Sequence, residues 1–297
     1  MSAKAAKPRI ETPFYFGGLA SCSGVFFTHP LDLLKVRMQT VKGTGTSIGS
    51  VVGQIAKQQG ISGFYKGLSA ALLRQATYST VRFGVYEAVR EKLRRPDGTV
   101  SNASGLLAGM LGGAIGGVFG NPADVANVRM QNDGSLPADQ RRNYKNIVNA
   151  LTRMAREEGI SSFFTGLGPN VIRGMIMTLS QVATYDIFKD KLVELGMDGD
   201  KVITHFCSSM LSAFVATTAT NPIDVAKTRI MNSKTKEYKG LVDALLTMVR
   251  KEGASSLLKG WVPSFFRLGP HTVLVFIFLE QYKSLYINYK LRNMQPA

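Results

Sequence analysis

Three long stretches of this chain contain no charged side chain. They cover residues 12–31, 98–123 and 202–223. As a helix, each stretch is long enough to cross a hydrocarbon layer of about 30 Å. Small residues recur within them at four-residue spacing, a pattern that lets helices in a membrane pack closely. The pattern predicts three membrane-spanning helices; the alternative is three glycine-rich helices of a soluble protein.

The charge-free stretches belong to an internal repeat. Each one leads into the phrase Pro-x-Asp, with its proline at position 30, 122 or 222. A second phrase follows in each unit, with two glycines, an arginine, and then an acid and a base. Its members are Gly60, Gly67, Arg74, Glu87 and Arg90; then Gly159, Gly166, Arg173, Asp186 and Lys189; then Gly253, Gly260, Arg267, Glu280 and Lys283. This self-similarity predicts three units, residues 12–97, 98–196 and 197–290.

The second half of each unit is also apolar, although single arginines interrupt it. Hydropathy alone would miss these segments. The repeat makes them equivalent to one another and therefore predicts a second spanning helix in every unit. The sequence thus predicts an all-α membrane protein with six transmembrane helices in three pseudo-symmetric repeats of about 100 residues.

The net charge of +16 suggests an acidic partner, but the placement of the basic residues argues against nucleic acid. They do not form one stripe with interleaved aromatic side chains. More than half of them lie in the connections within the units, residues 35–66, 127–165 and 227–259. This excess marks the connections as the inner, matrix-like face and places both termini on the opposite face.

The sequence gives no sign of catalytic chemistry. No nucleophile–base pair, metal cluster or phosphate loop recurs at a usable spacing, so we expect neither an enzyme nor a cofactor. Cys22 and Cys207 stand at non-equivalent places in apolar segments and indicate neither a disulfide framework nor a metal site. The short basic N-terminus lacks an apolar core, so we expect no cleaved targeting peptide.

The repeated phrases resemble those of the mitochondrial carrier family. They are the three Pro-x-Asp phrases, Glu158-Gly159, Glu252-Gly253 and Tyr65-Lys66-Gly67, and the resemblance covers residues 12–290. It implies six tilted helices around a water-filled cavity, short matrix helices, and a monomer surrounded by membrane lipids. It also implies the mitochondrial inner membrane, with both termini facing the intermembrane space.

Residues 121–133 (NPADVANVRMQND) and 227–234 (KTRIMNSK) look most like the dicarboxylate branch of that family. Residues 136–142 (LPADQRR) and 267–281 look equally like the oxoglutarate branch. The resemblance implies exchange of malate or succinate for phosphate or another small dianion. The alternatives are oxoglutarate/malate exchange, an uncoupling-type proton leak, and a non-transporting membrane adaptor.

The resemblance also assigns two gates, each a ring of ion pairs between neighbouring repeats. The expected matrix pairs are Asp124 with Lys227, Asp224 with Lys35 and Asp32 with Asn127, braced by Gln39 and Gln131. The expected cytoplasmic pairs are Glu87 with Lys189, Asp186 with Lys283 and Glu280 with Arg90, braced by Tyr86 and Tyr185. Because Asn127 and Met231 interrupt the matrix ring, we expect the empty protein to favour a closed cytoplasmic ring. Taken singly, such acid–base spacings also fit pairs on a solvated helix face.

Arg74, Arg173 and Arg267 occupy one equivalent position in the three second helices. Arginine keeps its charge and binds carboxylate or phosphate through two hydrogen bonds, so three convergent arginines predict an anion site. The alternative is that they reach the membrane surface as anchors. Polar residues that the other repeats do not reproduce are the candidates for substrate selection: Arg82, Gln75, Thr77, Gln181 and His271. Tyr78, between Arg74 and Arg82 on nearly the same helix face, is a further candidate.

Six glycines precede helices in the connections: Gly60, Gly67, Gly159, Gly166, Gly253 and Gly260. Helix N-termini offer free amides to phosphate groups, and the resemblance implies that cardiolipin binds there. The alternative is that these glycines only form the turns that lead into helices.

Overall fold

The structure is a computed structural model that describes residues 16–41, 47–94, 101–199, 201–233 and 237–294. Over these residues the regular structure is entirely helical. Six long helices are α1 (Phe16–Thr40), α3 (Leu68–Lys92), α4 (Asn102–Asp133), α6 (Leu167–Glu194), α7 (Val202–Asn232) and α9 (Trp261–Met294). The short ones are α2 (Ile48–Gln59), α5 (Ile147–Glu157), α8 (Leu241–Glu252) and the 3-10 turns η1 (Ile61–Tyr65), η2 (Ala138–Gln140), η3 (Ile160–Phe164) and η4 (Ala254–Leu258).

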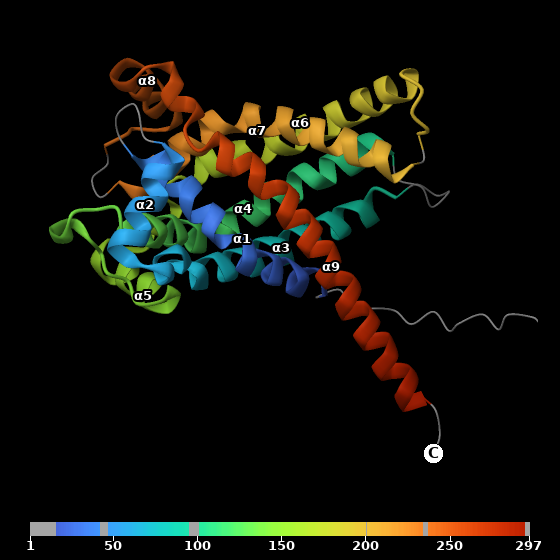
Figure 1. The fold of residues 1–297 in the computed structure, drawn as a ribbon, viewed down its shortest axis with the longest axis horizontal. Helices are drawn as coiled ribbons and strands as arrows, with labels where there is room; N and C mark the ends of the chain where they lie inside the picture. Colours follow the sequence, from blue (N-terminus) through green and yellow to red (C-terminus); the bar gives the residue numbers. More distant parts are fainter. Residues whose placement is uncertain (1–15, 42–46, 95–100, 200, 234–236, 295–297) are drawn as a thin grey trace, which may run out of the picture.

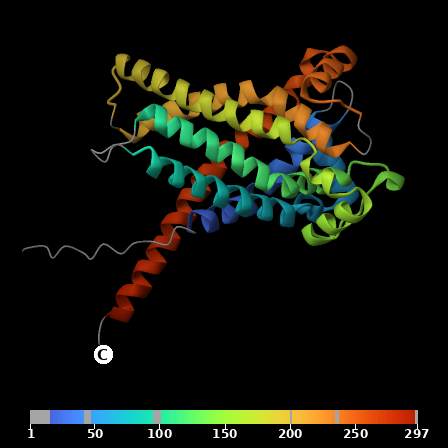
Figure 2. The same cartoon turned by 180° about the vertical axis from the view of Figure 1, so that it is seen from behind.

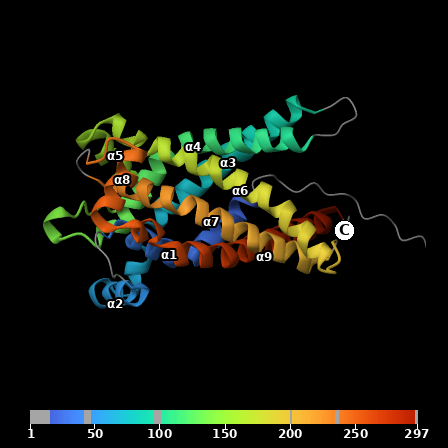
Figure 3. The same ribbon diagram turned by 90° about the horizontal axis from the view of Figure 1, so that it is seen from above.

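The six long helices form a closed ring in chain order. Each packs against the next, and α9 packs back against α1 (Figure 1). Seen from behind, the C-terminal part of α9 runs beyond the other helices (Figure 2). The short helices α2, α5 and α8 gather at one end of the bundle (Figure 3). This arrangement confirms the predicted fold of six long helices in three pairs with short connecting helices.

We call the end that carries α2, α5 and α8 the matrix end, following the orientation expected from the charges, and the other the cytoplasmic end. By length and apolar composition alone, one described stretch, Ala103–Asp133 of α4, passes as a membrane span. The other long helices carry charged residues that face the interior, as described below. Exposed aromatic side chains such as Phe27, Phe119 and Phe266 lie on the helices, as expected for a bundle whose outer surface meets hydrocarbon.

Side-chain caps fix where the helices of the connections begin. Asn146 accepts a hydrogen bond from the backbone N–H of Asn149 at 2.8 Å and so starts α5. Ser47 accepts one from Ser50 at the start of α2. Each cap satisfies a backbone donor that has no partner within the helix.

The core at the matrix end consists of three similar apolar clusters, one under each short helix. Ile55 of α2, Met154 of α5 and Met248 of α8 are buried at the centres of these clusters. Their partners are apolar residues on the last turns of α1, α4 and α7, such as Leu33, Val128 and Val225. The short helices are therefore packed against the long ones by burial of apolar surface.

Glycine turns bring each connection close to the neighbouring repeat. All six predicted glycines have positive φ, from +65° at Gly60 to +86° at Gly67. A Cβ at Gly67, Gly166 or Gly260 would lie 3.0, 2.8 or 2.9 Å from the Cγ of residue 131, 231 or 39 respectively. At these three positions only glycine fits both the backbone angle and the space, which agrees with the interpretation of the glycines as turn residues.

Three buried arginines join the matrix ends of α1, α4 and α7 into a second ring, which we call the arginine staple. The Nε atoms of Arg37, Arg129 and Arg229 donate to the backbone carbonyls of Gln131, Met231 and Gln39, at 3.1, 3.0 and 3.0 Å. Each donation therefore runs from one repeat to the next and closes around the bundle.

The outer ends of the staple arginines bind the short connections. Arg129 and Arg229 each contact both oxygens of a glutamate, Glu158 and Glu252, whereas the counterpart in the first repeat is the neutral Gln59. Hydrogen bonds from Arg229, and then from Lys259, hold the pKa of Glu252 at about 2, below its ordinary value of 4.5. At this position the described part of the first repeat therefore has a hydrogen bond to a neutral side chain where the other two repeats have an ion pair.

Candidate functional site

Two of the predicted matrix pairs are present, so the structure is closed at the matrix end. Lys35 of α1 donates to Asp224 of α7 at 2.6 Å, and Lys227 of α7 is paired with Asp124 of α4. Each pair joins the ends of two repeats. We call Asp32, Lys35, Asp124, Asp224 and Lys227, with the arginines that contact them, the ion-pair ring.

The third predicted matrix contact, between Asp32 and Asn127, is replaced by others. The Asn127 side-chain carbonyl accepts a hydrogen bond from Gln131 of the same helix at 3.1 Å. Asp32 is instead 2.9 Å from the Nε atom of Arg267 in α9. The pairing expected from the family pattern is thus wrong at this position, because a neutral amide attracts the carboxylate less than a nearby guanidinium does.

The predicted glutamine braces also bind elsewhere. Gln39 accepts a hydrogen bond from Thr228 at 2.9 Å, and Gln131 donates to Asn127. Both glutamines are fully buried, and one polar atom of each has no hydrogen-bond partner among the described residues. Within this part of the chain they lie next to the ion-pair ring without hydrogen bonds to its charges.

The three predicted anion-site arginines all reach the ion-pair ring. Arg173 is paired with Asp224, Arg267 with Asp32, and the Nε atom of Arg74 lies 3.9 Å from Asp124. In each case the arginine comes from the repeat that precedes its aspartate. This regular pattern argues against the alternative in which the arginines are anchors at the membrane surface.

A central cavity of about 330 Å³ lies beside the ion-pair ring on its cytoplasmic side. The three arginines line it together with Asp124 and Lys227. Further lining residues include Gln75, Tyr78, Arg82, Asn170, Thr178 and Gln181. The cavity therefore brings together charged groups from all three repeats, as expected of an anion site in a pseudo-symmetric bundle.

Four of the six predicted selectivity residues line the central cavity, and two lie elsewhere. The guanidinium of Arg82 stacks on Tyr78, 5.9 Å from the ring centre. Thr77 is not among the lining residues, and its hydroxyl donates to the Leu73 carbonyl at 2.8 Å. His271 is also outside the lining and packs against α1, where its Nδ1 atom lies 3.5 Å from the Thr28 hydroxyl.

The cytoplasmic ring is open. Arg90 pairs with Glu87 of its own helix and Lys283 with Glu280 of its own helix, both at 3.9 Å and both partly exposed. These pairs replace the predicted ones between repeats. Tyr185 does not brace a gate pair either, since its hydroxyl is hydrogen-bonded to Nδ1 of His205 at 2.5 Å. Tyr86 lies beneath the guanidinium of Arg90, 6.0 Å from the ring centre.

The expected resting state is therefore opposite to the one in the structure, which is closed at the matrix end. The expectation compared only the motif acids and bases of the two rings. It did not include Arg74, Arg173 and Arg267, which contact the matrix aspartates and have no counterpart at the cytoplasmic ring among the described ion pairs.

Asn170 is a site residue that sequence reasoning missed. Its side-chain carbonyl accepts a hydrogen bond from Lys227 at 2.8 Å, and its amide donates to Asn121 at 3.1 Å. Its repeat equivalents are Ala71 and Ser264, so it satisfies the rule of asymmetric polar residues that selected Arg82. Applying that rule to the first turn of the second helices would have found it.

Comparison with known proteins agrees with this architecture. The family model described as mitochondrial carrier protein matches residues 9–97, 98–195 and 198–290. The mitochondrial citrate transporter F of Aspergillus niger is 49% identical over 96% of this chain and 94% of its own. The mitochondrial dicarboxylate transporter of Candida glabrata is 46% identical, over 94% and 96% respectively. The mitochondrial 2-oxoglutarate/malate carrier protein of Mus musculus is also 46% identical, over 95% of each chain. The chain therefore belongs to the mitochondrial carrier protein family.

Proposed function

We propose that the protein exchanges small dicarboxylates, such as malate and succinate, for phosphate or another small dianion across the mitochondrial inner membrane. The observation that carries this proposal is the convergence of three arginines, one from each repeat, at the base of the central cavity. Arginine recognises carboxylate and phosphate through paired hydrogen bonds.

The charge of the site fits a small polyanion. The lining of the ion-pair ring holds Lys35, Lys227 and the three arginines against three aspartates, an excess of two positive charges. Asn127 limits this excess, because a lysine in that position would add a third charge. Arg82, higher in the central cavity, contributes one more positive charge. An anion that enters the cavity therefore compensates charges that the protein leaves unbalanced.

The same arginines couple anion binding to the matrix gate. To bind a substrate carboxylate, Arg173 has to give up its contact with Asp224, and Arg267 its contact with Asp32. Asp224 then keeps its pair with Lys35. Asp32 has no second cation among the described ion pairs, so it becomes a half-buried carboxylate without a partner. That state is unfavourable and promotes opening of the matrix end.

The names of two relatives suggest other carboxylates as substrates. The 46% identical mouse protein is named a 2-oxoglutarate/malate carrier, which makes oxoglutarate/malate exchange the second candidate function. The 49% identical Aspergillus protein is named a citrate transporter, so a tricarboxylate belongs in any test of specificity.

Orientation and lipid binding complete the proposal. Both termini face the intermembrane space, because basic residues are concentrated at the matrix end and six helices cross the membrane. The protein works as a monomer, since one chain supplies all three arginines of the site. Cardiolipin binds at the glycine turns that precede α3, α6 and α9, because helix N-termini can donate backbone N–H groups to phosphate.

The test is counter-exchange in proteoliposomes loaded with malate, oxoglutarate, citrate, phosphate or ADP. We expect malate uptake with internal malate or phosphate, and little uptake into empty vesicles or with ADP. Arg173→Lys keeps the positive charge but removes the planar guanidinium that binds two oxygens, so it should lose most uptake. Lys191→Arg, on the same helix but outside the cavity lining, is the control and should keep normal uptake. Exchange of ADP as fast as malate would contradict the proposal.

A further inference from the structure

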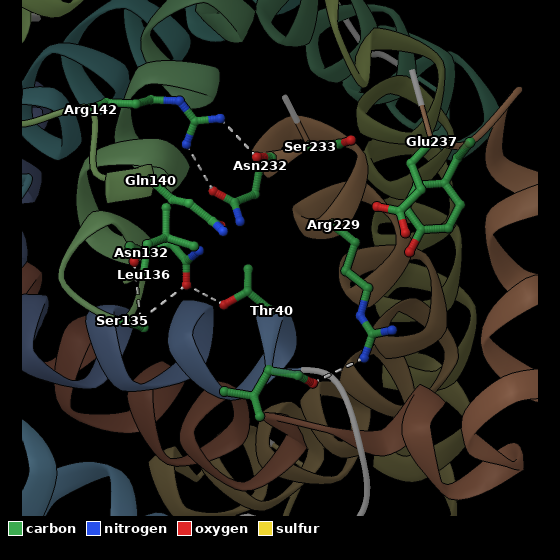
Figure 4. A pocket seen from close by; sticks show the side chains of 12 residues that line it. Thr40, Asn132, Ser135, Leu136, Gln140, Arg142, Arg229, Asn232, Ser233 and Glu237 are labelled. Carbon is green, nitrogen blue, oxygen red and sulfur yellow. Dashed lines mark hydrogen bonds between the residues drawn. The ribbon is translucent and has the colours of Figure 1, made fainter. Parts of the chain in front are cut away.

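A second pocket of about 490 Å³ opens at the matrix end (Figure 4). We call it the mouth pocket. It is lined by the last turns of α1, α4 and α7 and by the segments that follow them, and it shares no lining residue with the central cavity or the ion-pair ring. The closed gate therefore separates two distinct spaces along the bundle.

Arg142 is a buried cation at the edge of the mouth pocket, with only 7% of its surface exposed. Its Nη atoms donate to the backbone and side-chain carbonyls of Asn232, at 2.9 and 3.4 Å. Within the described residues its guanidinium forms no ion pair with a carboxylate, in contrast to Arg129 and Arg229. Burial and the neighbouring Arg129 lower the pKa of Arg142, and the nearby Tyr144, Glu158 and Asp133 offset this only in part.

The backbone around Arg142 is held in place by several hydrogen bonds. The carboxylate of Asp133 accepts from the amides of Arg142 and Asn143, at 2.6 and 2.8 Å. The side chain of Arg153 donates to the Arg142 carbonyl at 2.6 Å. These contacts fix the arginine at the edge of the pocket, so its position does not depend on a bound molecule.

The segment that carries Arg142 breaks the three-fold pattern of the bundle. It spans residues 134–146, whereas the corresponding connections in the other repeats span residues 41–47 and 233–240. A feature found in one repeat of three is not required by the repeat architecture. This extra length, with a buried arginine at its end, therefore indicates a role beyond packing.

Arginines outnumber acids among the lining residues of the mouth pocket, and Asp133, which binds the backbone of Arg142, is not one of these lining residues. Arg229 lines the pocket but is bound to Glu252. Glu237, the one acid among the lining residues, lies across the pocket from Arg142 (Figure 4). The lining also includes the side chains of Gln140 and Asn132, whose amide groups can donate hydrogen bonds (Figure 4).

We propose that the mouth pocket is a second anion-binding site, which holds a small carboxylate or phosphate at the matrix end through Arg142. A buried cation without a carboxylate partner is costly, and an anion bound beside it removes part of that cost. The site differs from the central cavity in its residues and in the side from which it is reached. The inference does not depend on which anion the central cavity transports.

The experiment measures the charge of the mouth pocket with a local probe. Ser135 lines the pocket and is exposed, so Ser135→Cys is introduced after Cys22 and Cys207 have been replaced by serine. The purified protein is labelled with an anionic and with a neutral thiol reagent, with and without phosphate or malonate. We expect the anionic reagent to react about fivefold faster than the neutral one, and both anions to slow labelling.

Two variants assign the effect to Arg142. Arg142→Gln and Asn232→Asp should each abolish the preference for the anionic reagent, the second by supplying a carboxylate next to an intact arginine. Arg141→Gln is the matched control, because that arginine lies outside the pocket lining and donates to the Leu136 carbonyl. Each variant is checked by thermal unfolding, and Asn232→Asp decides the question if Arg142→Gln does not fold.

Loss of the preference in both pocket variants but not in Arg141→Gln supports the site. Equal effects of the three substitutions would mean that the reagents respond to net charge and would overturn the proposal. Protection by phosphate or malonate that persists in Arg142→Gln would show that the anions act from the central cavity, which also overturns it.

Discussion

Replacing Asn127 with lysine should strengthen the closed matrix gate. In the structure Asp224 contacts Lys35 and Arg173, and Asp124 contacts Lys227 and Arg74. Asp32 contacts one cation, Arg267. Residue 127 occupies the position of Lys35 and Lys227 in the second repeat, so a lysine there should reach Asp32 as they reach their own aspartates.

The expected effect follows from the burial of this pair. The Asp32 and Arg267 side chains are 13% and 18% exposed, which places an added lysine between a surface site and a fully buried one. A pair in such a place contributes about 1 kcal/mol after desolvation and repulsion from the other cations. That is about a fivefold decrease in the population open toward the matrix.

The assay is side-specific labelling of a cysteine in the central cavity. Thr178→Cys, in protein whose two native cysteines have been replaced, is exposed to an impermeant reagent from the matrix side. We expect the labelling rate to fall about fivefold in Asn127→Lys and to stay unchanged in Asn127→Gln. In an Asp32→Asn background the lysine has no carboxylate to bind, so its effect should disappear. The same decrease in that background would refute the reasoning.

Three further predictions test other parts of the structure. Gly260→Ala should destabilise the protein more than Gly253→Ala. Both glycines have positive φ, where an alanine costs about 1–2 kcal/mol of stability. Of the two, only Gly260 faces a neighbouring side chain, at 2.9 Å from the added Cβ. Thermal unfolding of the two variants measures the difference in stability. Equal losses of stability would show that the close approach of Gln39 to residue 260 has no effect. The pKa of Glu252 is depressed to about 2, so its stabilisation is present above 4.5 and is lost as the pH falls from there toward 2. Glu252→Gln should thus be less stable than the unmodified protein near neutral pH, with a gap that narrows in acid; a gap independent of pH contradicts this. Arg82→Gln should lower dicarboxylate uptake and change the relative rates for malate, oxoglutarate and citrate, whereas unchanged ratios would make Arg82 structural.

Most of the fold was predictable because the same pattern occurs three times. One unit alone would have left the second helices undetected, since Arg74 and Arg82 interrupt the apolar stretch of the first. The arginine staple was not predictable. It depends on hydrogen bonds from Arg37, Arg129 and Arg229 to backbone carbonyls of the next repeat, and a backbone acceptor leaves no trace in the residue pattern.

The site was predictable in its members but less so in its pairings. Position and residue type placed the three arginines in the cavity, and the repeat indicated two of the matrix pairs. Thr77 and His271 were selected only for their lack of symmetry partners, which says nothing about the direction in which a helix turns them. Pairing in the open ring depends on the state of the bundle, so the sequence alone did not decide it.

The charges explain how one site can favour each gate in turn. In the empty protein, five ion pairs hold the matrix aspartates: those of Lys35 and Lys227 and those of the three arginines. The closed cytoplasmic ring predicted from the sequence would have three pairs, fewer than these five, and the structure is closed at the matrix end. In the mechanism that we propose, a bound dianion draws all three arginines away from the aspartates, which leaves two matrix pairs against the three cytoplasmic pairs predicted from the sequence. The preference then reverses, so substrate binding itself provides the free energy that moves the closure from one end to the other.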